Sequence, residues 1–249
     1  MQIRDLVTKL DQLLLVDQWL NTDHSQNGLQ VQPAAQEIKK VALAVDANLD
    51  TFVQAAREKV ELLFVHHGLF WRENLLVTGV HYQRLCALLR SGVGLYASHL
   101  PLDAHPKLGH NAQLAKLFKL QNLQPLDVGW HGDLPKPLSR AEVLAQLKLP
   151  PQHHAHFLEF GPAQVSHLGI ISGGGGAHTY VNLAYAAGCD LYLTGEISHL
   201  TVQFAREAKL NVIAAGHYWT EMIGLLALER YLQTEFNLET VWLESPTGF

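Results

Sequence analysis

The segment Leu62-Leu63-Phe64-Val65-His66-His67-Gly68 places two histidines directly after four apolar residues. A short apolar run that ends in polar residues is typical of a strand buried on both faces of a parallel sheet. Similar runs occur at residues 41–45 and 93–97, and the segments 49–60 and 81–91 have the pattern of helices. Strands that alternate with helices predict an α/β fold with a parallel sheet covered on both faces.

The second half of the sequence repeats this alternation. In each half an apolar run is followed by a histidine and, four positions later, by an acidic residue. The pairs are His99 with Asp103 and His217 with Glu221, and each residue of the second pair lies 118 positions after its counterpart in the first. The match predicts two similar α/β lobes with mostly parallel sheets. The elements expected in the second half are strands at 168–171, 190–193 and 211–215 and helices at 177–187, 199–208 and 219–233.

The stretch 125–162 interrupts the alternation. It holds six prolines around one short helix, which opens with the capping box Ser139-Arg140-Ala141-Glu142. We expect an inter-lobe excursion or a peripheral segment here. The predicted domains are therefore residues 1–125, the first lobe, and 126–249, the excursion with the second lobe, whose C-terminal helix is able to pack on the first lobe.

Composition excludes several classes of protein. Hydrophobic residues make up 48% of the 249 positions and charged residues 16%, which supports a buried core and excludes a disordered chain. The net charge of −5, with no block of like charge, argues against DNA and an anionic membrane as partners. No apolar run approaches the roughly 20 residues of a membrane helix, and charge comes too early for a secretory signal. We expect a cytoplasmic globular protein.

Polar side chains follow the expected strands at the points where they end. Because ligands bind at the carboxyl ends of parallel strands, we expect these side chains to converge. Imidazoles with carboxylates suit Zn, Mn, Fe or Co, and the absence of cysteine from these positions excludes a thiolate site there. The residues at the strand ends are His66, His67, His99, Asp103, Thr194, Gly195, Glu196, His217 and Glu221.

The spacing suggests how these groups are presented. Pro101 predicts an extended loop for the first His-x-x-x-acid unit, whereas His217 and Glu221 straddle a strand-to-helix junction where i,i+4 spacing brings them together. Adjacent residues of a strand point in opposite directions, so His66 and His67 serve two neighbouring metals more readily than one. A carboxylate such as Glu221 is able to bridge two ions.

Other polar segments have more than one interpretation. The run 172–176 suits a tight turn or close backbone packing better than a phosphate cradle, because it lacks the Lys-Ser/Thr of a P-loop. The tract His153-His154-x-His156 is expected to be exposed and without a metal role. Asp46 either lines the site or caps the next helix, and Glu196 either supports a ligand or contacts substrate. Histidines expected in loops or at the surface are His81, His105, His110 and His131.

Six motifs spread over the whole chain carry a resemblance to a known family. They are Asn27-Gly28-Leu29-Gln30-Val31, Val65-His66-His67-Gly68-Leu69-Phe70-Trp71, Ser98-His99-Leu100-Pro101-Leu102-Asp103, Asp103-Ala104-His105-Pro106, Thr194-Gly195-Glu196 and Ala215-Gly216-His217-Tyr218-Trp219-Thr220-Glu221. Together they resemble the NGG-interacting-factor-three-like proteins, also labelled GTP cyclohydrolase I type 2 homologues. The resemblance implies a two-lobed α/β subunit, a dinuclear metal site in the cleft between the lobes, and a homohexameric ring.

The resemblance also implies roles for individual residues. His99 would sit in the same cleft, as a hydrogen-bonding group, a ligand or a proton-transfer group, and His99 and Glu221 are the candidate catalytic residues. Two departures from the family pattern are His110 and His199. The implied ligands of two divalent ions (Zn, Mn, Fe or Co) are His66, His67, Asp103, His217 and Glu221, with Glu221 bridging.

Two main hypotheses for function follow. The first is a dinuclear-metal-dependent hydrolase of the GTP cyclohydrolase type 2 kind, acting on a nucleotide or a related ring or phosphate substrate, with the glycines around Gly174 as a candidate phosphate contact. The alternative is a non-catalytic, metal-binding hexameric scaffold or regulatory protein. A third hypothesis, metal storage in the His-rich loops, requires more than two ions per chain.

Overall fold

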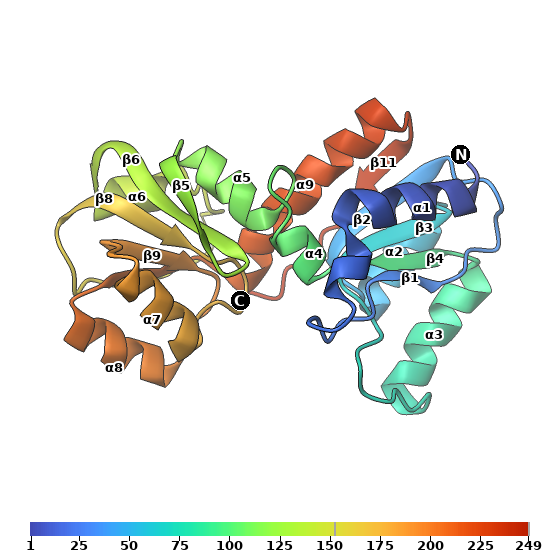
Figure 1. Cartoon of the computed structure of the whole chain (residues 1–249). Helices are drawn as coiled ribbons and strands as arrows, with labels where there is room; N and C mark the ends of the chain where they lie inside the picture. Colours follow the sequence, from blue (N-terminus) through green and yellow to red (C-terminus); the bar gives the residue numbers. More distant parts are fainter. Residues whose placement is uncertain (152, 249) are drawn as a thin grey trace. The chain divides into compact units, whose positions relative to one another are not determined.

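Two sheets organise the chain in the computed structural model, which describes residues 1–151 and 153–248 (Figure 1). The chain divides into two units. The first comprises Met1–His105 with Leu225–Ser245, and the second comprises Pro106–Gly224 with the end of the chain from Pro246. The prediction of a two-sheet α/β protein with mostly parallel strands is confirmed.

The first unit contains a five-stranded sheet with its strands in the order β1-β4-β3-β2-β11. Only β1 is antiparallel to its neighbour; the other pairs are parallel. The strands are β1 (Gly28–Val31), β2 (Lys40–Asp46), β3 (Leu62–His67), β4 (Gly94–Ala97) and β11 (Glu239–Trp242). The helices are α1 (Ile3–Leu14), the short 3-10 helix η1 (Val16–Trp19), α2 (Leu49–Arg57), α3 (Gly79–Ser91) and α4 (Leu100–Asp103).

Both faces of this sheet are covered. On one face Leu63 and Val65 of β3 pack in a core with Phe52 of α2 and Leu88 of α3. On the other face the hydroxyl of Tyr96 in β4 donates a 2.7 Å hydrogen bond to the Asp11 carboxylate of α1. Burial on both sides explains why the central strands are continuous apolar runs rather than alternating ones.

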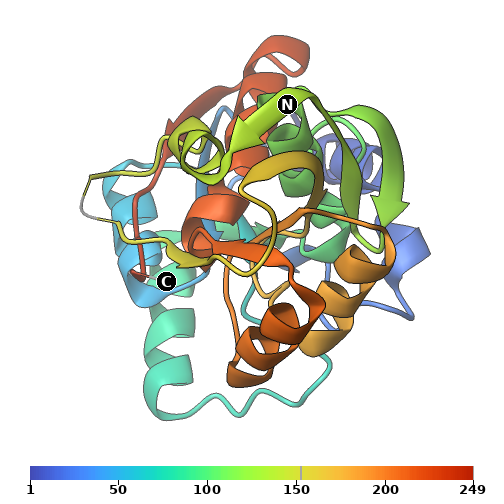
Figure 2. The same ribbon diagram turned by 90° about the vertical axis from the view of Figure 1, so that its left-hand side faces the viewer.

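The second unit contains a six-stranded sheet in the order β5-β6-β8-β9-β10-β7. Strands β8, β9 and β10 are parallel, and β5, β6 and β7 join them in antiparallel pairs. Helices α7 and α8 lie side by side over one face (Figure 2), and α5 and α6 cover the other. The bounds are β5 (Gln121–Leu126), β6 (Gly129–Ser139), β7 (His156–Leu158), β8 (Gln164–Ile170), β9 (Leu191–Thr194), β10 (Asn211–Ala214), α5 (His110–Leu117), α6 (Arg140–Gln146), α7 (His178–Ala186) and α8 (His199–Ala208).

The proline-rich stretch, expected to be an inter-lobe excursion or a peripheral segment, contributes strands to the second sheet, including parts of both edges. Its residues form β6 and β7 and the end of β5. Prolines are tolerated because Pro125 lies in the edge strand β5, while Pro135 and Pro137 lie where the register of β6 against β8 shifts. The capping box at Ser139 begins α6 as expected.

The observed division of the chain differs from the predicted boundary at residues 125 and 126. Helix α5 belongs to the second unit because its Leu114 and Ala115 pack with Leu168 and Ile170 of β8. Helix α9 (His217–Glu235) begins in the second unit and continues in the first from Leu225, and β11 then pairs with β2. These long-range pairings leave no local signal in the sequence. None of the helices in the described ranges combines the length and hydropathy needed to cross a bilayer.

A buried asparagine ties three backbone segments of the second unit together, and its removal tests the packing. Asn211 accepts from the Gly161 N–H at 3.0 Å and donates to the carbonyls of Pro162 and Asp190 at 2.8 and 3.1 Å. We expect Asn211→Ala to lower the free energy of unfolding by about 2–4 kcal/mol, because buried backbone groups lose their partners. Denaturant unfolding followed by circular dichroism measures it. The exposed Asn182→Ala is the control; equal losses would contradict this role.

Candidate metal centre

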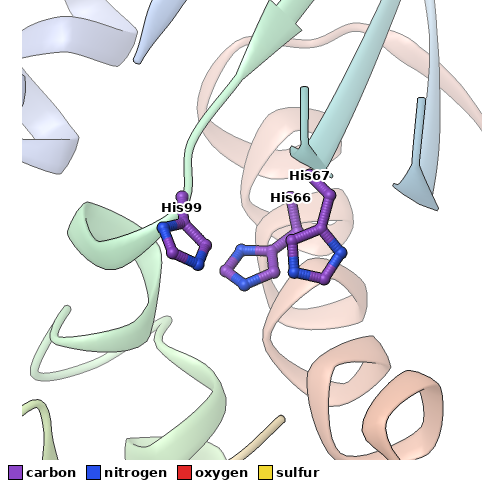
Figure 3. A group of neighbouring side chains, drawn as sticks. All are labelled: His66, His67 and His99. Atoms are coloured by element: carbon purple, nitrogen blue, oxygen red, sulfur yellow. The ribbon is translucent and has the colours of Figure 1, made fainter. Parts of the chain in front are cut away.

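Three histidines of the first unit come together at the carboxyl ends of two parallel strands. His66 and His67 end β3, His99 follows β4, and their rings lie close together in Figure 3. The ring centre of His66 is 4.6 Å from that of His67 and 5.1 Å from that of His99. One nitrogen from each lies within 4.8 Å of the others. The side chains of His66 and His67 were expected to point in opposite directions, but at the end of β3 their rings lie close together.

His66 is fully buried, and its hydrogen bonding defines which nitrogen is basic. Its Nδ1 lies 2.9 Å from the carbonyl oxygen of Ser98, which only accepts, so Nδ1 carries the proton. The other nitrogen, Nε2, lies 3.5 Å from Oδ2 of Asp103. An imidazole oriented through Nδ1 and facing a carboxylate with Nε2 has the arrangement of a metal-binding histidine.

His67 and His99 are oriented in the same way by carboxylates. Nδ1 of His67 lies 2.8 Å from Oδ1 of Asp46, and Nδ1 of His99 lies 2.9 Å from Oδ1 of Asp23. Of the two interpretations of Asp46, support of the site holds, because the N-terminal cap of α2 is Asn48. Carboxylates that fix the distal nitrogen also raise the basicity of the nitrogen left for a metal.

Asp23 is a buried anion that organises the turn around His99. Besides His99 Nδ1, it accepts hydrogen bonds from the N–H groups of Ser25 and Leu100 at 2.9 Å and from the Asn27 side chain at 2.8 Å. Asn27 in turn accepts from the His99 N–H at 2.8 Å. Burial opposes ionisation of Asp23, but the hydrogen bonds from His99, Asn27 and Ser25 outweigh it and lower its pKa to about 2.

His99 and Asp103 lie on a helical turn, and the predicted extended loop is wrong. Helix α4 begins after His99, and Pro101 occupies its first turn. A proline is tolerated there because the first N–H groups of a helix have no intrahelical acceptor. The N–H of Asp103 instead donates to the His99 carbonyl at 3.2 Å.

The Asn27–Val31 motif also holds the loop that follows His67. The side-chain oxygen of Gln30 accepts from the N–H groups of Leu69 and Phe70 at 2.8 and 3.2 Å, and its nitrogen donates to the Gln26 carbonyl at 2.7 Å. A Cβ at Gly68 would overlap the Gln30 carboxamide. The motif therefore fixes the loops after β3 and β4, a role that the sequence pattern alone did not reveal.

The second unit carries a histidine between two carboxylates at the start of α9. Nε2 of His217 lies 3.1 Å from Oε2 of Glu221, one helical turn later, and Nδ1 lies 2.6 Å from Oε1 of Glu196. The predicted i,i+4 contact is confirmed, and Glu196 supports a candidate ligand. Burial lowers the pKa of His217, but the hydrogen bonds and charges of Glu221 and Glu196 dominate together and raise it to about 9.

The glycine run packs against this pair, as the turn interpretation predicted. Gly173 has a φ of +56°, and a Cβ there would overlap the Glu221 carboxylate. The N–H of Gly173 donates to the Thr220 hydroxyl at 2.9 Å, and its carbonyl accepts from the N–H groups of Gly195 and Glu196 at 3.1 Å. These backbone groups hold the loop to the start of α9 and are not directed at a phosphate.

The His153–His156 tract lines a cavity of about 530 Å³ in the second unit, together with Glu196. His154 and His156 are exposed as expected. His153 is half-buried instead, and its Nε2 lies 2.8 Å from the Ala215 carbonyl. A cavity of this size suits a small-molecule ligand.

Two histidines assigned to loops or the surface lie elsewhere. His110 is fully buried at the start of α5, where its Nδ1 accepts from the Gly224 N–H at 3.2 Å. His131 lies in β6 and is half-buried. Both errors arise from the same cause, because no local pattern indicates that the second sheet includes β5 and β6 and is covered by α5.

Comparison with known proteins agrees with the motifs. The protein-family model described as Duf34/NIF3 (NGG1p interacting factor 3) matches residues 1–247 of this chain. A GTP cyclohydrolase 1 type 2 homolog of Pyrococcus abyssi is 38% identical over 100% of both chains, and one of Haemophilus influenzae is 38% identical over 90% of this chain and 93% of that protein. The structure of TTHA1606 from Thermus thermophilus has a TM-score of 0.90, with 38% identity over 100% of both chains. Reduced HcgD from Methanocaldococcus jannaschii has a TM-score of 0.87, with 29% identity over 98% of both chains.

The low pKa of Asp23 gives a pH-dependent contribution to stability. Its carboxylate stabilises the fold above its ordinary pKa of 3.8, and this contribution is lost as the pH falls toward 2. We expect Asp23→Asn to lower the free energy of unfolding at pH 7 by about 2 kcal/mol, with a smaller difference near pH 2. Urea unfolding across this pH range measures it. The exposed Asp17→Asn is the control, and a loss in Asp23→Asn that does not change with pH would contradict the assignment.

The raised pKa of His217 predicts proton release when a metal binds. In the metal-free protein the imidazole stays protonated up to about pH 9, and a ligating nitrogen must lose its proton. Calorimetric titration with Zn²⁺ in buffers of different ionisation enthalpy should show close to one proton from this group at pH 7.5 and none well above pH 9. Glu196→Gln should shift this release to lower pH, whereas the exposed Glu207→Gln should not. A release unaffected by Glu196→Gln would contradict the coupling.

Proposed function

Because the chain belongs to the Duf34/NIF3 family, we propose that it is a cytoplasmic hydrolase that depends on two divalent metal ions and acts on a nucleotide or a related ring or phosphate substrate. One observation carries the proposal: His66, His67, His99 and His217 each have Nδ1 at a carbonyl or carboxylate acceptor. Nδ1 thus carries a proton in each, and Nε2 would be the ligating atom of His66, His67 and His217, as is usual for metal-bound histidine.

Five residues are the proposed metal ligands. His66, His67 and Asp103 of the first unit and His217 and Glu221 of the second would hold the ions, with Glu221 contributing both oxygens. The donors are nitrogen and oxygen only, which suits Zn, Mn, Fe or Co and leaves the choice among these four to metal supply.

The bound ions would supply Lewis acidity and lower the pKa of water from 15.7 to about 7. His99 would then transfer a proton at Nε2. Its Nδ1–H donates to Asp23, whose low pKa keeps it ionised at neutral pH, so this anion stabilises the imidazolium that forms when Nε2 accepts a proton. Glu221 is the residue whose loss would affect binding and catalysis together.

The substrate class rests on the cavity beside Glu196 and on the names of the relatives. The relatives from Pyrococcus abyssi and Haemophilus influenzae are named GTP cyclohydrolase 1 type 2 homologs. The cavity of about 530 Å³ is large enough for a nucleotide. His154 and His156 at its wall are exposed and can donate hydrogen bonds to phosphate oxygens. These two imidazoles replace the glycine run as the proposed phosphate contact.

The alternative function is a metal-stabilised homohexameric scaffold, and one surface favours assembly. Large apolar side chains are exposed on α3 and the loop before it, with Leu76 at 74%, Leu89 at 66% and Val80 at 60%. Exposed large apolar side chains concentrated on one segment of a chain are candidates for an association surface. A hydrolase can also assemble into a hexamer. The two hypotheses therefore differ in whether the metal-loaded protein consumes a substrate. Analytical ultracentrifugation of the metal-loaded chain counts its subunits.

Metal content and turnover, measured together, test the proposal. Metal-depleted protein is reloaded with Mn, Zn, Fe or Co and supplied with GTP and a panel of phosphate esters. We expect His66→Ala and Glu221→Gln each to lose at least one bound ion per chain and to reduce turnover more than about 100-fold, by removing ligands from the two units in turn. The exposed His199→Ala is the matched control. His99→Gln should keep the ions and lose turnover.

Three other outcomes are informative. A metal content unchanged in both His66→Ala and Glu221→Gln would refute the centre. Metal that raises the melting temperature by mass action, with no substrate consumed, would identify the scaffold instead. Loss of metal in His99→Gln would make His99 a ligand.

A further inference from the structure

A second group of metal-ligating side chains lies on one face of the second sheet. Strands β6 and β8 pair with Asp133 opposite His167 and with His131 opposite Gly169. Opposed residues of an antiparallel pair, and residues two positions apart on one strand, project to the same face. Asp133, His131 and His167 therefore share that face, and Gly169 leaves a gap in it.

Hydrogen bonds connect these side chains in a chain that defines the protonation of His167. The Asn122 amide donates to Oδ2 of Asp133 at 2.8 Å, and Oδ1 of Asp133 lies 2.7 Å from Nδ1 of His167. Nδ1 of His167 thus carries a proton, and Nε2 is its basic nitrogen. That nitrogen lies 2.9 Å from Nδ1 of His131. The aspartate orients one imidazole so that its lone pair points at the other.

The gap at Gly169 is filled by the thiol of Cys189. Cys189 lies just before β9 and is buried, and a Cβ at Gly169 would lie only 2.9 Å from its sulfur. One nitrogen from each of His131 and His167 and the sulfur of Cys189 all lie within 4.8 Å of one another. Ligands on a tetrahedral zinc ion, at about 2.0–2.1 Å for nitrogen and about 2.3 Å for sulfur, also lie within this separation of one another.

We propose that His131, His167 and Cys189 form a separate mononuclear site for Zn²⁺, with Asp133 orienting His167 through its distal nitrogen. Two imidazoles with one thiolate are donors that zinc accepts, and three protein ligands leave a fourth position for water or a small ligand. The carboxylate–imidazole pair repeats the arrangement at His67 and His99. This site is independent of the proposed hydrolase centre because it uses sulfur and residues of the second unit alone.

The protonation states agree with this assignment. Burial and the neighbouring His167 lower the pKa of His131, so this imidazole is neutral at pH 7 and able to bind a metal. Burial, with a smaller contribution from Asp190, raises the pKa of Cys189 to about 12. The thiol therefore loses its proton only when the metal replaces it.

Cobalt absorption tests the site selectively. The full chain has two cysteines, Cys86 and Cys189, and the proposed hydrolase centre contains neither. Metal-depleted protein titrated with Co²⁺ should develop a near-ultraviolet thiolate-to-cobalt band, whose final intensity corresponds to one thiolate-bound ion per chain. The band should persist in Cys86→Ala and disappear in Cys189→Ala. Asp133→Asn should weaken Co²⁺ binding at this site by about 10–100-fold, as expected for loss of an orienting carboxylate.

The same protein gives the outcomes that would overturn the site. Absence of the band in wild type and in Cys86→Ala refutes it, as does a band retained in Cys189→Ala. If Cys189→Ala fails to fold, the Cys86→Ala variant still identifies the sulfur ligand, because Cys189 is then the one cysteine left in the chain. Failure here leaves the hydrolase centre intact, because His66→Ala and Glu221→Gln report on that centre through ions that have no sulfur ligand.

Discussion

The candidate centre depends on one repeated interaction, the hydrogen bond from Nδ1 of an imidazole to a fixed oxygen acceptor. Ser98, Asp46, Asp23 and Glu196 provide that acceptor for four histidines. Each bond fixes the ring orientation and keeps a proton on Nδ1, so that Nε2 is the nitrogen through which a metal or a proton would bind. Burying an anion such as Asp23 costs free energy, which its several donors offset. The acceptors therefore determine the chemistry as much as the histidines do.

The rest of each unit serves to hold these hydrogen bonds in place. In the first unit Asn27 and Gln30 fasten the loops after β4 and β3 through their backbone groups. In the second, Gly173 and Gly195 allow two loops to approach the start of α9 more closely than any side chain would permit. Glycine is required at Gly173 for its positive φ as well as for space. The apolar strands supply a rigid base from which these loops depart.

The sequence was sufficient for strands β2, β3, β4, β8, β9 and β10 and for most helices. It was insufficient for the other strands and for the side chains that orient the candidate ligands. Apolar runs such as 62–65 leave a local signal, and so do histidines placed directly after them. Asp23 leaves none, because its role depends on a turn 76 residues away in the chain. The prediction of the second sheet was incomplete for a similar reason. Pro135 and Pro137 argue against a strand, and they are tolerated in β6 because its register against β8 shifts there, which the local sequence does not indicate. The helical turn at Pro101 was misjudged because the first turn of a helix tolerates proline.

Anomalous diffraction from crystals of the metal-loaded protein, recorded at the absorption edge of the bound metal, shows whether these side chains hold two ions. We expect two peaks per chain among His66, His67, Asp103, His217 and Glu221, with Nε2 of each histidine about 2.0–2.1 Å from a peak if the metal is zinc. Each Nδ1 should keep its oxygen acceptor. Peaks on Nδ1 atoms, or no peak at these residues in a protein that retains metal, would contradict this expectation.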